Sequence, residues 1–580
     1  MQSRNPFYRR RRMARPRTAS WLLGVRALGI VLGVSMLGAA WTFSIGHPVV
    51  ASIAAGLDAT IRVLVRPVAA LASGSDDAAD AVDTSAQIAQ QVNAVAFPQG
   101  IASGDVTSTS AVIWARGAAP GTMHVEYAVG ATMQRIVATR SAPVTDANDL
   151  TATVRLDGLT PDAQYSYRVW FETGDKGNDP LARQVGTFRT APRPDAPAPL
   201  SLIFSADLGG AGYCRRADGG YPIFETMRRL QPDLFLAMGD MIYADQTCPA
   251  AGPGGRVNVP GEFTSIDDPT VDWANRAQVL DVYRRHWRYN RADPAFQRLL
   301  ASTALEVQWD DHEIIDDAGA DWTSWAPQAS RAGYPGLVAA ARQTLFEYSP
   351  IDRNPDDPNC LYRVIHWGAD ADLFLLDDRS YRSRDDQDDT SADNKTMLGH
   401  AQLAWLEQGL LSSRATWKII STTTTLSVPT TGPMLTPYGG DGWAGGPVAD
   451  GNQVGFKREL GHLLQFLAVN HVKNVVFVSG DVHRALSIRY QAKVDLNAVP
   501  MLFHEFVVGP LSAGTPPADT ATRLDPTFSP QLLYGESGFF NFGYLHIARG
   551  ADGVPTLTAD VRGEDGQPRA GSQVVLTPQS

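Results

Sequence analysis

Four polar residues follow one another without a spacer after an apolar run that ends in Trp309. They are Asp310, Asp311, His312 and Glu313, within the sequence VQWDDHEIID. Three carboxylates beside one imidazole repel one another, so this cluster is costly to gather unless something positive lies among them. These residue types therefore predict a bound cation at this point of the chain.

Four further apolar runs of strand length end directly in side chains that bind metals or anions. The runs and the residues that they deliver are LSLIFSADLGG with Asp207, PDLFLAMGDMIYAD with Asp240 and Tyr243, ADLFLLDDRSYR with Asp377, Asp378 and Arg379, and KNVVFVSGDVHRA with Asp481 and His483. A single Asp after a strand is usually a turn former or a helix cap. Five such strand ends in one chain are not independent accidents, and together they predict a metal site.

The ligand types indicate which metals this site binds. Carboxylates, a phenol and an imidazole, without a thiolate at the strand ends, suit harder cations such as Fe, Mn, Ca or Mg. Tyr243 follows Asp240 by three residues, and a phenolate favours Fe(III). There are more ligands than one ion needs, which predicts a multinuclear site. Two metals about 3.5–4 Å apart can clamp the oxygens of a phosphoryl displacement and activate the attacking water.

The elements that position these residues alternate between strand and helix. Helical patterns lie between the apolar runs, for example YPIFETMRRLQ at 221–231 and LGHAQLAWLEQGLLSSR at 398–414. This alternation predicts an α/β fold with two sheets covered by helices. In such folds the carboxyl ends of strands bring distant pieces of chain to one site.

A compact β module is predicted before these runs. Alternating apolar residues broken by Gly, Pro, Asp and Asn indicate short antiparallel strands, as in 102–117 and 151–173. The segment LTPDAQYSYRV at 159–169 is similar to the fibronectin type III signature, in which a Tyr after a Thr-Pro turn packs at the sandwich corner. A Pro-rich linker at 187–199 ends the module, and we expect it to have a packing role.

The N-terminus has the pattern of a targeting or anchoring segment. Arg9–Arg12 form a basic run, and Ala27–Ile45 are all apolar, small or Ser/Thr. This length is close to the roughly 20 residues that cross a bilayer. A cleaved signal, a twin-arginine signal and an uncleaved anchor all fit, and the length of the apolar stretch favours the anchor. The charge precedes the apolar stretch, so we expect the rest of the chain to be exported.

Composition limits the function classes. A chain of 580 residues suggests two or three domains, and its net charge of −11 argues against a broad nucleic-acid-binding surface. Three cysteines do not make a disulfide scaffold. Cys214 and Cys248 lie in Gly/Pro-rich loops, and their pairing stays open, with Cys360 left over.

The motifs SADLGG, GDMIYAD, WDDHE and VFVSGDVHRA follow the stretch FPQGIASGDVTSTSAVIWAR in that order. This set resembles the alkaline phosphatase D (PhoD) family of the metallophosphoesterase superfamily, from Val95 to the C-terminus. The resemblance implies an α/β fold with a four-layer αββα core, preceded by a small fibronectin III-like β-sandwich and an N-terminal apolar helix. It also implies hydrolysis of phosphate mono- and/or diesters by a metal-activated water, with Fe(3+) and Ca(2+) as the metals, although other divalent metals fit the same ligands.

Carried over residue by residue, the resemblance implies metal ligands at Asp207, Asp240, Tyr243, Asp311, Asp481 and His483. Asp240 would bridge the metals, and Tyr243 would ligate iron. His312 stands at the His of the superfamily motif GNH, which protonates the leaving alkoxide or orients the phosphate. Asp311 stands at the Asn of that motif.

One position departs from the family pattern. Many members have Ser-Cys after the first strand, whereas this chain has Ala206-Asp207. The sequence Asp-Leu-Gly here resembles the DxG motif of purple acid phosphatases. A carboxylate is a harder ligand than a thiolate, so we expect a different metal composition and pH optimum.

Three residues beside these ligands have expected roles outside the ligand set. Arg379 either contacts the phosphate or a metal-bound carboxylate, or pairs with Asp377 or Asp378. Glu313 and Asp316 are expected to orient His312 from outside the ligand set.

The sequence thus predicts an N-terminal signal or anchor with a linker at 1–94, a β-sandwich at 95–195 and a metallophosphatase domain at 198–576. One alternative is a purple acid phosphatase-like phosphomonoesterase, which would carry GNH and GHxH motifs where this chain has DDHE and GDVH. The other is a non-catalytic, membrane-tethered binding protein, which would have lost ligands. We expect a small phosphate ester as substrate and attachment to the membrane through the N-terminal segment. The cell envelope, on its periplasmic or extracellular side, is the expected location, and the oligomeric state stays open.

Overall fold

The computed structural model describes residues 96–173, 182–319, 333–385, 387–390, 395–429, 441–447, 453–494 and 500–579. The predicted N-terminal anchor at 27–45 and the linker after it lie outside these ranges. None of the helices within them combines the length and the apolar character that a bilayer span requires.

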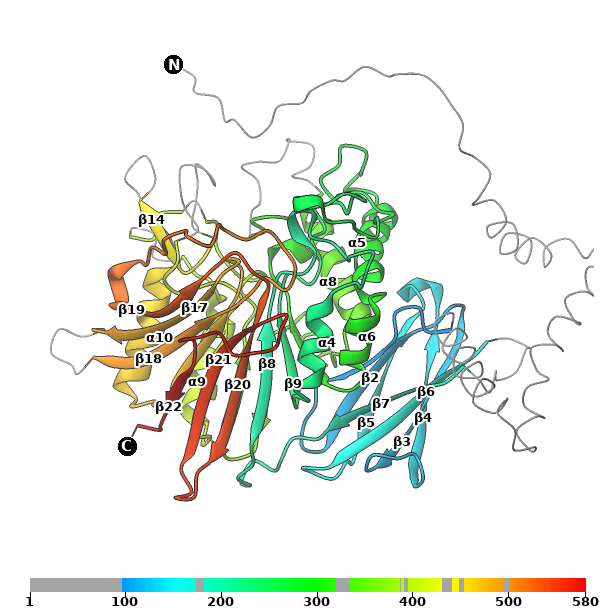
Figure 1. Cartoon of the computed structure of the whole chain (residues 1–580), viewed down its shortest axis with the longest axis horizontal. Helices are drawn as coiled ribbons and strands as arrows, with labels where there is room; N and C mark the ends of the chain where they lie inside the picture. Colours follow the sequence, from blue (N-terminus) through cyan, green and yellow to red (C-terminus); the bar gives the residue numbers. More distant parts are fainter. Residues whose placement is uncertain are drawn as a thin grey trace, which may run out of the picture. The chain divides into compact units, whose positions relative to one another are not determined.

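Two large sheets form the centre of the described chain (Figure 1). In order across the first sheet, the strands are β22 (Val574–Leu576), β21 (Pro555–Gly563), β20 (Asn541–Arg549), β8 (Leu200–Ser205), β9 (Leu234–Met238), β10 (Ala304–Gln308), β1 (Ile101–Gly104), β2 (Ser110–Arg116) and β5 (Thr151–Asp157). In the second sheet they are β11 (Arg363–Trp367), β12 (Ala371–Leu375), β13 (Trp417–Ser421), β16 (Val475–Ser479), β18 (Met501–Val507), β17 (Ala485–Ala492) and β19 (Pro530–Glu536). A small hairpin pairs β14 (Ala444–Pro447) with β15 (Gln453–Gly455).

Alternating side chains on the strands define the layers. Leu202 and Phe204 of β8 join a core shared with the second sheet, whereas Ile203 between them packs under helices. Those helices are α4 (Pro222–Arg229), α5 (Arg276–Arg291), α6 (Pro294–Leu300) and α8 (Tyr334–Tyr348). On the second sheet, Phe374 points away from the shared core towards α9 (Gly399–Ser412) and α10 (Lys457–Val469). The order is therefore helices, sheet, sheet, helices, as the resemblance implied.

The β-sandwich shares a sheet with this core. Its outer layer contains β4 (Ile136–Val144), β3 (Gly121–Val129), β6 (Gln164–Glu172) and β7 (Gln184–Arg189). Its other layer is β1, β2 and β5, which continue the nine-stranded sheet because β1 pairs in parallel with β10 at Gly104 and Leu305. The backbone N–H of Thr160 donates to the hydroxyl of Tyr165 at 2.8 Å, so this Tyr packs at the Thr-Pro turn as the sequence predicted.

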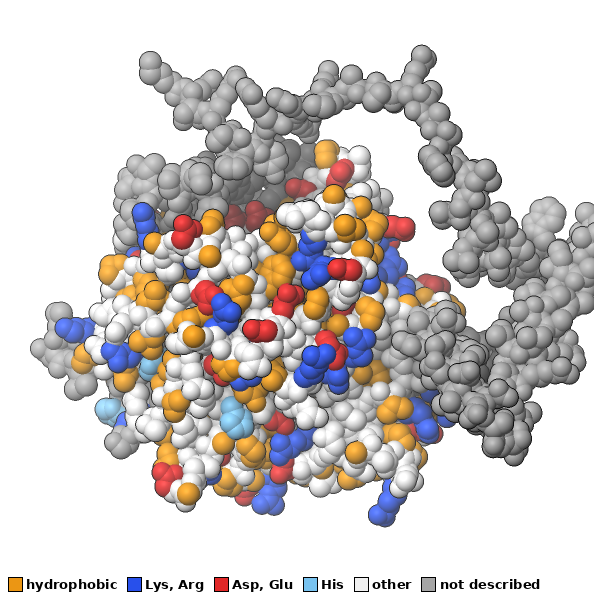
Figure 2. Space-filling model, viewed as in Figure 1, with side chains coloured by type: hydrophobic (Ala, Val, Ile, Leu, Met, Phe, Trp, Pro, Cys, Tyr) orange, Lys and Arg blue, Asp and Glu red, His pale blue; other side chains and the backbone are white. Residues whose placement is uncertain are grey.

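On the face drawn in Figure 2, basic and acidic side chains are interspersed among polar and apolar ones. Exposed large apolar side chains among the described residues are scattered, for example Val137 of β4 and Val185 of β7 in the sandwich and Val469 of α10.

Candidate metal centre

The predicted ligands lie at the carboxyl ends of strands in both sheets. In the first sheet β8, β9 and β10 are adjacent and parallel, so Asp207, Asp240 and Asp311 follow the same edge. In the second sheet β12, β13 and β16 are also parallel, and Asp481 follows β16. The two edges meet, because the Oγ1 hydroxyl of Thr423 in the second sheet donates to Asp310 in the first at 2.7 Å.

Backbone conformation turns several of these side chains inward. Asp207, Asp240, Asp481 and His483 have φ of 67°, 53°, 69° and 54°, the left-handed region that Asp and His enter more readily than most residues. Such conformations cost free energy and concentrate at functional sites. The four residues thus have backbone strain in common as well as ligand chemistry.

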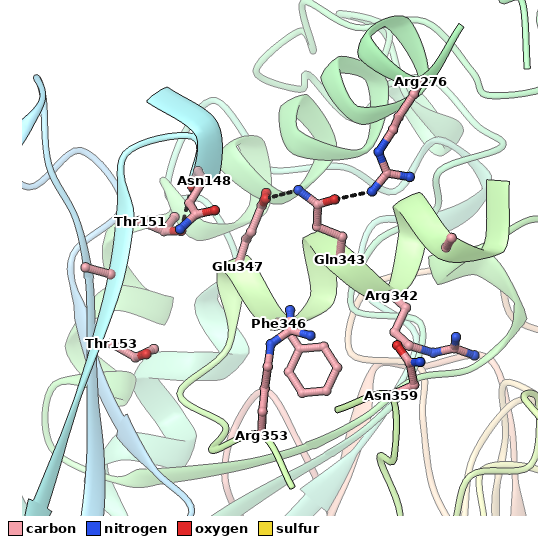
Figure 3. A pocket seen from close by; sticks show the side chains of 12 residues that line it. Asn148, Thr151, Thr153, Arg276, Arg342, Gln343, Phe346, Glu347, Arg353 and Asn359 are labelled. Atoms are coloured by element: carbon pink, nitrogen blue, oxygen red, sulfur yellow. Dashed lines mark hydrogen bonds between the residues drawn. The ribbon is translucent and has the colours of Figure 1, made fainter. Parts of the chain in front are cut away.

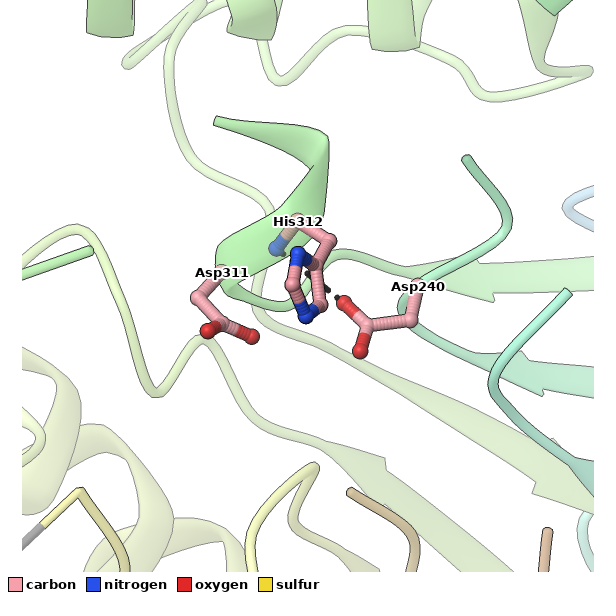
Figure 4. Close-up of side chains that lie close together, drawn as sticks. All are labelled: Asp240, Asp311 and His312. Carbon is pink, nitrogen blue, oxygen red and sulfur yellow. Dashed lines mark hydrogen bonds between the residues drawn. The ribbon is translucent and has the colours of Figure 1, made fainter. Parts of the chain in front are cut away.

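Of the three groups of candidate ligands that share Asp311 among the described residues, two join the ends of different strands. In the first, ligand atoms of Asp240, Asp311 and His312 all lie within 4.8 Å of one another (Figure 4). The backbone N–H of His312 also donates to Oδ1 of Asp240 at 3.1 Å. In the second, Asp310, Asp311 and Asp481 meet the same limit. Asp310 belongs to the motif WDDHE, but the resemblance implies no ligand at this position.

A separate group, without Asp311, joins Asp207, Tyr243 and His483. The Nε2 atom of His483 lies 3.4 Å from Oδ1 of Asp207 and 2.8 Å from the hydroxyl oxygen of Tyr243. Gly210 permits this approach, since a Cβ atom there would lie 2.5 Å from the Tyr243 ring. The structure therefore brings together all six predicted metal ligands and His312.

The donor atoms at this centre fit bound cations. Asp207 is fully buried, and neither of its carboxylate oxygens accepts a hydrogen bond from the described residues. The same is true of Oδ2 of Asp481. A buried carboxylate without a donor is strongly unfavourable, and coordination to a metal ion removes that cost.

The electrostatics lead to the same conclusion. Burial, and then the neighbouring carboxylates Asp311 and Asp310, raise the pKa of Asp240 well above its usual value, although His312 opposes this. Burial and nearby carboxylates, Asp207 first, raise the pKa of Tyr243. Burial and acidic neighbours also raise the pKa of Asp481. Each shift reflects negative charge that a cation would stabilise.

One positive charge among the carboxylates is Arg379. Its guanidinium, which is fully buried, pairs with Asp310 and Asp441, and it lies 3.4 Å from Asp311. Of the alternatives that the sequence left open, Arg379 therefore contacts a predicted ligand carboxylate, Asp311, and its guanidinium forms no salt bridge with Asp377 or Asp378 among the described residues.

Asp377 and Asp378 have structural partners instead. Asp377 accepts from the indole N–H of Trp309 at 2.8 Å. Asp378 accepts from the backbone N–H of Thr423 at 2.7 Å. These bonds fix the ends of the strands. Neither residue belongs to a candidate metal-binding group of the described residues.

His312 has a carboxylate partner that sequence reasoning missed. Its Nδ1 atom lies 2.7 Å from Oδ1 of Asp245, and the ring of Tyr243 packs at a centroid distance of 4.0 Å. Burial alone would lower the pKa of His312, but Asp245, Asp311 and Asp240 raise it well above its usual value. The only sequence signal for Asp245 was its place at the end of the motif GDMIYAD.

The predicted role of Glu313 is wrong. Its carboxylate does not contact the imidazole but accepts from the backbone N–H groups of Asp240, Met241 and Asp310, at 2.8, 2.6 and 2.8 Å. Glu313 thus joins the loops after β9 and β10. Asp316 does lie near the imidazole, with Oδ1 3.6 Å from Nε2 of His312.

A disulfide bond links the loops after β8 and β9. Cys214 and Cys248 are bonded, which settles the pairing that the sequence left open, and Cys360 is free. Cys214 follows Asp207 and Cys248 follows Tyr243 along the chain. The bond therefore fastens two ligand-bearing loops to each other.

Comparisons with known proteins place this geometry in a family. The description "PhoD-like phosphatase" matches residues 204–554, and "PhoD-like phosphatase, N-terminal domain" matches residues 82–192. The chain belongs to the PhoD-like phosphatase family. It is a phosphoric ester hydrolase, of the metal-dependent phosphatase class.

Known relatives match this PhoD-like chain over most of its length, and solved structures are similar to it in fold. It is 27% identical over 461 residues to alkaline phosphatase D of Bacillus subtilis (strain 168), covering 74% of this chain and 71% of the relative. A solved structure of PhoD is similar with a TM-score of 0.63 and 21% identity, over 84% of this chain and 93% of that one. A purple acid phosphatase from yellow lupin (Lupinus luteus) seeds has a TM-score of 0.50 and 14% identity, over 82% and 73% of the two chains.

Proposed function

We propose that this PhoD-like phosphatase is exported and hydrolyses phosphate monoesters and diesters at the centre formed by the strand-end carboxylates. The observation that carries the proposal is the set of buried carboxylate oxygens that accept no hydrogen bond from the described residues, both of Asp207 and Oδ2 of Asp481, beside an imidazole held by Asp245. This arrangement combines cation ligands with a positioned proton donor.

The donor atoms divide into two kinds, which supports two kinds of metal. Asp207, Asp240, Tyr243 and His483 offer carboxylate, phenolate and imidazole, a set that suits Fe(3+). Asp310, Asp311 and Asp481 offer oxygen only, which suits Ca(2+). When bound, such ions supply activation of the water nucleophile and neutralisation of charge on the phosphoryl group.

His312 acts as the general acid in this proposal. The carboxylate of Asp245 orients the imidazole through Nδ1, so Nε2 is the atom that donates a proton to the departing alkoxide oxygen. Arg379 forms salt bridges with Asp310 and Asp311 and holds these carboxylates in place. In this proposal the phosphate oxygens therefore contact the metals and His312, and not Arg379.

Export is supported by the disulfide bond, because such bonds persist mainly in oxidising compartments. We propose the periplasmic or extracellular side of the cell envelope, with the segment at 27–45 as signal or membrane anchor. Fractionation of cells that produce the full chain, with and without residues 1–94, tests this directly.

The catalytic proposal is tested by metal analysis of the purified protein, with parallel assays on p-nitrophenyl phosphate and bis-p-nitrophenyl phosphate. We expect His312→Ala to abolish turnover with its metals retained, and Asp240→Ala to lose metal as well. A visible charge-transfer band that disappears in Tyr243→Phe would identify the phenolate as an iron ligand. Normal turnover by the His312 variant would refute the role of the imidazole.

A second candidate is a phosphatase restricted to monoesters, like purple acid phosphatases. The observation that favours it is Asp207, a carboxylate in the Asp-Leu-Gly sequence where many PhoD members have a thiolate. Turnover of the monoester without turnover of the diester would support this candidate over the first.

A further inference from the structure

A hollow separate from the metal centre lies between the sandwich and α8 (Figure 3). Strand β5 forms one wall and one face of α8 forms the other, and the hollow encloses about 430 Å³. None of the ligands described above lines it. We infer that this hollow binds the phosphate group of a small phosphorylated molecule.

Three arginines line the hollow from three segments of the chain. Arg276 begins α5, Arg342 lies on α8, and Arg353 follows α8 in the next loop (Figure 3). Among the described residues, none of these three arginines forms an ion pair with a carboxylate. Three guanidinium groups without a carboxylate partner therefore line a single hollow of a protein whose net charge is −11.

The one acidic side chain in the lining is already neutralised. Glu347 accepts two hydrogen bonds from Arg284, from Nε at 2.8 Å and from Nη2 at 2.7 Å. Arg284 does not line the hollow. The lining residues therefore have a formal charge of +2, from three guanidinium groups and one carboxylate.

The guanidinium groups also keep donors to spare. Arg276 donates to the amide oxygen of Gln343, and Arg342 donates to the hydroxyl of Ser380 at 3.0 Å. The Nε atom of Arg342 is buried and has no hydrogen-bond partner among the described residues. Arg353 donates to the carbonyl of Pro358 at 3.2 Å. Because each guanidinium presents five N–H donors, the described residues engage only a minority of them, and a ligand with several acceptor oxygens would engage others.

The charge selects phosphate over carboxylate. A phosphate monoester brings close to two negative charges and three acceptor oxygens, which match the formal charge of the lining and the forked geometry of guanidinium. A carboxylate brings one charge and two oxygens. The volume lies in the range of small-molecule sites, about 300–1,000 Å³, and leaves room for an organic part beside the phosphate.

The rest of the lining indicates what that organic part is. Asn148, Asn359 and Thr153 contribute amides and a hydroxyl. The aromatic face of Phe346 is covered by Arg353, whose guanidinium carbon lies 4.0 Å from the ring centroid. Neutral polar groups without a free aromatic surface suit the hydroxyls of a sugar phosphate better than a flat base.

Arginine modification by phenylglyoxal, followed by peptide mass spectrometry of the full-length metal-loaded protein, tests the site with inorganic phosphate as the probe. We expect phosphate at about four times its dissociation constant to slow modification of Arg276 and Arg353 about fivefold. Arg193 and Arg229 are 67% and 72% exposed and serve as controls whose rates stay constant. Acetate, a monocarboxylate with one charge and two oxygens, should protect less.

Titration calorimetry with inorganic phosphate gives an independent readout. We expect wild type to bind phosphate at two sites, the metal centre and the hollow. The double variant Arg276→Gln/Arg353→Gln should lose the site in the hollow, while Arg193→Gln/Arg229→Gln keeps both. Arg342 is left intact because its hydrogen bond to Ser380 connects it to the chain beside Arg379. Equal modification rates with and without phosphate, or acetate protecting as well as phosphate, would overturn the inference.

Discussion

The Nδ1 atom of His312 lies 2.7 Å from Oδ1 of Asp245, although the two residues come from loops that follow different strands. The backbone N–H of Ala244 also donates to the carbonyl of His312 at 3.0 Å, so the loops are joined on both sides of the imidazole. The carboxylate keeps the ring in one orientation and raises the pKa of His312. Asp245 is thus a positioning residue for the proton donor of the proposed mechanism.

Asp245→Asn should reduce kcat mainly for substrates whose leaving group needs a proton. Without the carboxylate the imidazole is less often protonated, and general acid catalysis is typically worth about 10²–10⁴ in rate. We expect a large fall with phenyl phosphate and a small one with 2,4-dinitrophenyl phosphate, whose leaving group departs unprotonated. The measurement is the ratio of kcat values for the two esters.

The control for this experiment is Asp281→Asn, since Asp281 pairs with Arg285 on the exposed face of α5. It should leave the ratio unchanged. If Asp245→Asn slowed both esters equally while the metal content stayed constant, Asp245 would have only a structural role.

Asp207→Asn should lower the metal content and yet stabilise the metal-free protein. The buried carboxylate accepts no hydrogen bond from the described residues, and removing its charge relieves about 1–3 kcal/mol of desolvation cost in the absence of metal, which we expect to exceed the loss of the 3.4 Å contact with His483. Elemental analysis gives the metal content, and thermal unfolding after chelation gives the stability. Asp233→Asn is a matched control, because Asp233 pairs with Arg189 at 3.0 Å and its loss should destabilise. A metal content equal to that of the wild type would exclude Asp207 as a ligand.

The strand-end carboxylates were predictable because each follows an apolar run of strand length. Parallel strands share an edge, so Asp207, Asp240 and Asp311 had to approach one another once the fold class was known. The partner of His312 was not predictable in this way. Asp245 reaches the imidazole through the path of a loop, and no periodicity encodes that path.

The shared sheet of the sandwich shows a similar limit. Alternation at 102–117 predicted strands but not their neighbours. The parallel pairing of β1 with β10 rests on one register pair, Gly104 with Leu305, between residues far apart in sequence. The prediction of a bound cation beside Asp310 and Asp311 was incomplete, because a side chain of the protein, Arg379, supplies one of the positive charges there.

Arg379→Gln should destabilise the protein strongly. The guanidinium compensates Asp310, Asp311 and Asp441 in a buried setting, and removing one partner of a buried pair costs about 3–5 kcal/mol. Denaturation with urea measures the loss. Arg285→Gln breaks an exposed pair with Asp281 and should cost less than about 1 kcal/mol. Unchanged stability combined with a raised KM would instead assign Arg379 to the phosphate.

The double variant Cys214→Ser/Cys248→Ser should lose both stability and metal. The cysteines are 34 residues apart, and a disulfide closing a loop of that size contributes about 3–4 kcal/mol. Because the bond joins the loops that carry Asp207 and Tyr243, we also expect weaker metal retention during dialysis. Cys360→Ser is the control with neither effect. Full metal retention in the double variant would show that the loops hold their geometry without the bond.

His504→Gln should flatten the dependence of stability on pH below neutrality. Burial, and then Arg489 opposite it on the neighbouring strand, lower the pKa of His504 to about 4. The unfolded chain takes up this proton near pH 6.5 whereas the folded protein does not, so stability is lost as pH falls from about 6.5 towards 4. Because the ring is partly exposed, we expect this loss of unfolding free energy at pH 5 to be about 1–2 kcal/mol.

Urea denaturation at pH 7 and pH 5 measures the difference in unfolding free energy. The difference should shrink in His504→Gln but not in His400→Gln, an exposed control on α9. Parallel pH profiles for wild type and His504→Gln would mean that the folded protein accepts the proton as readily as the unfolded chain.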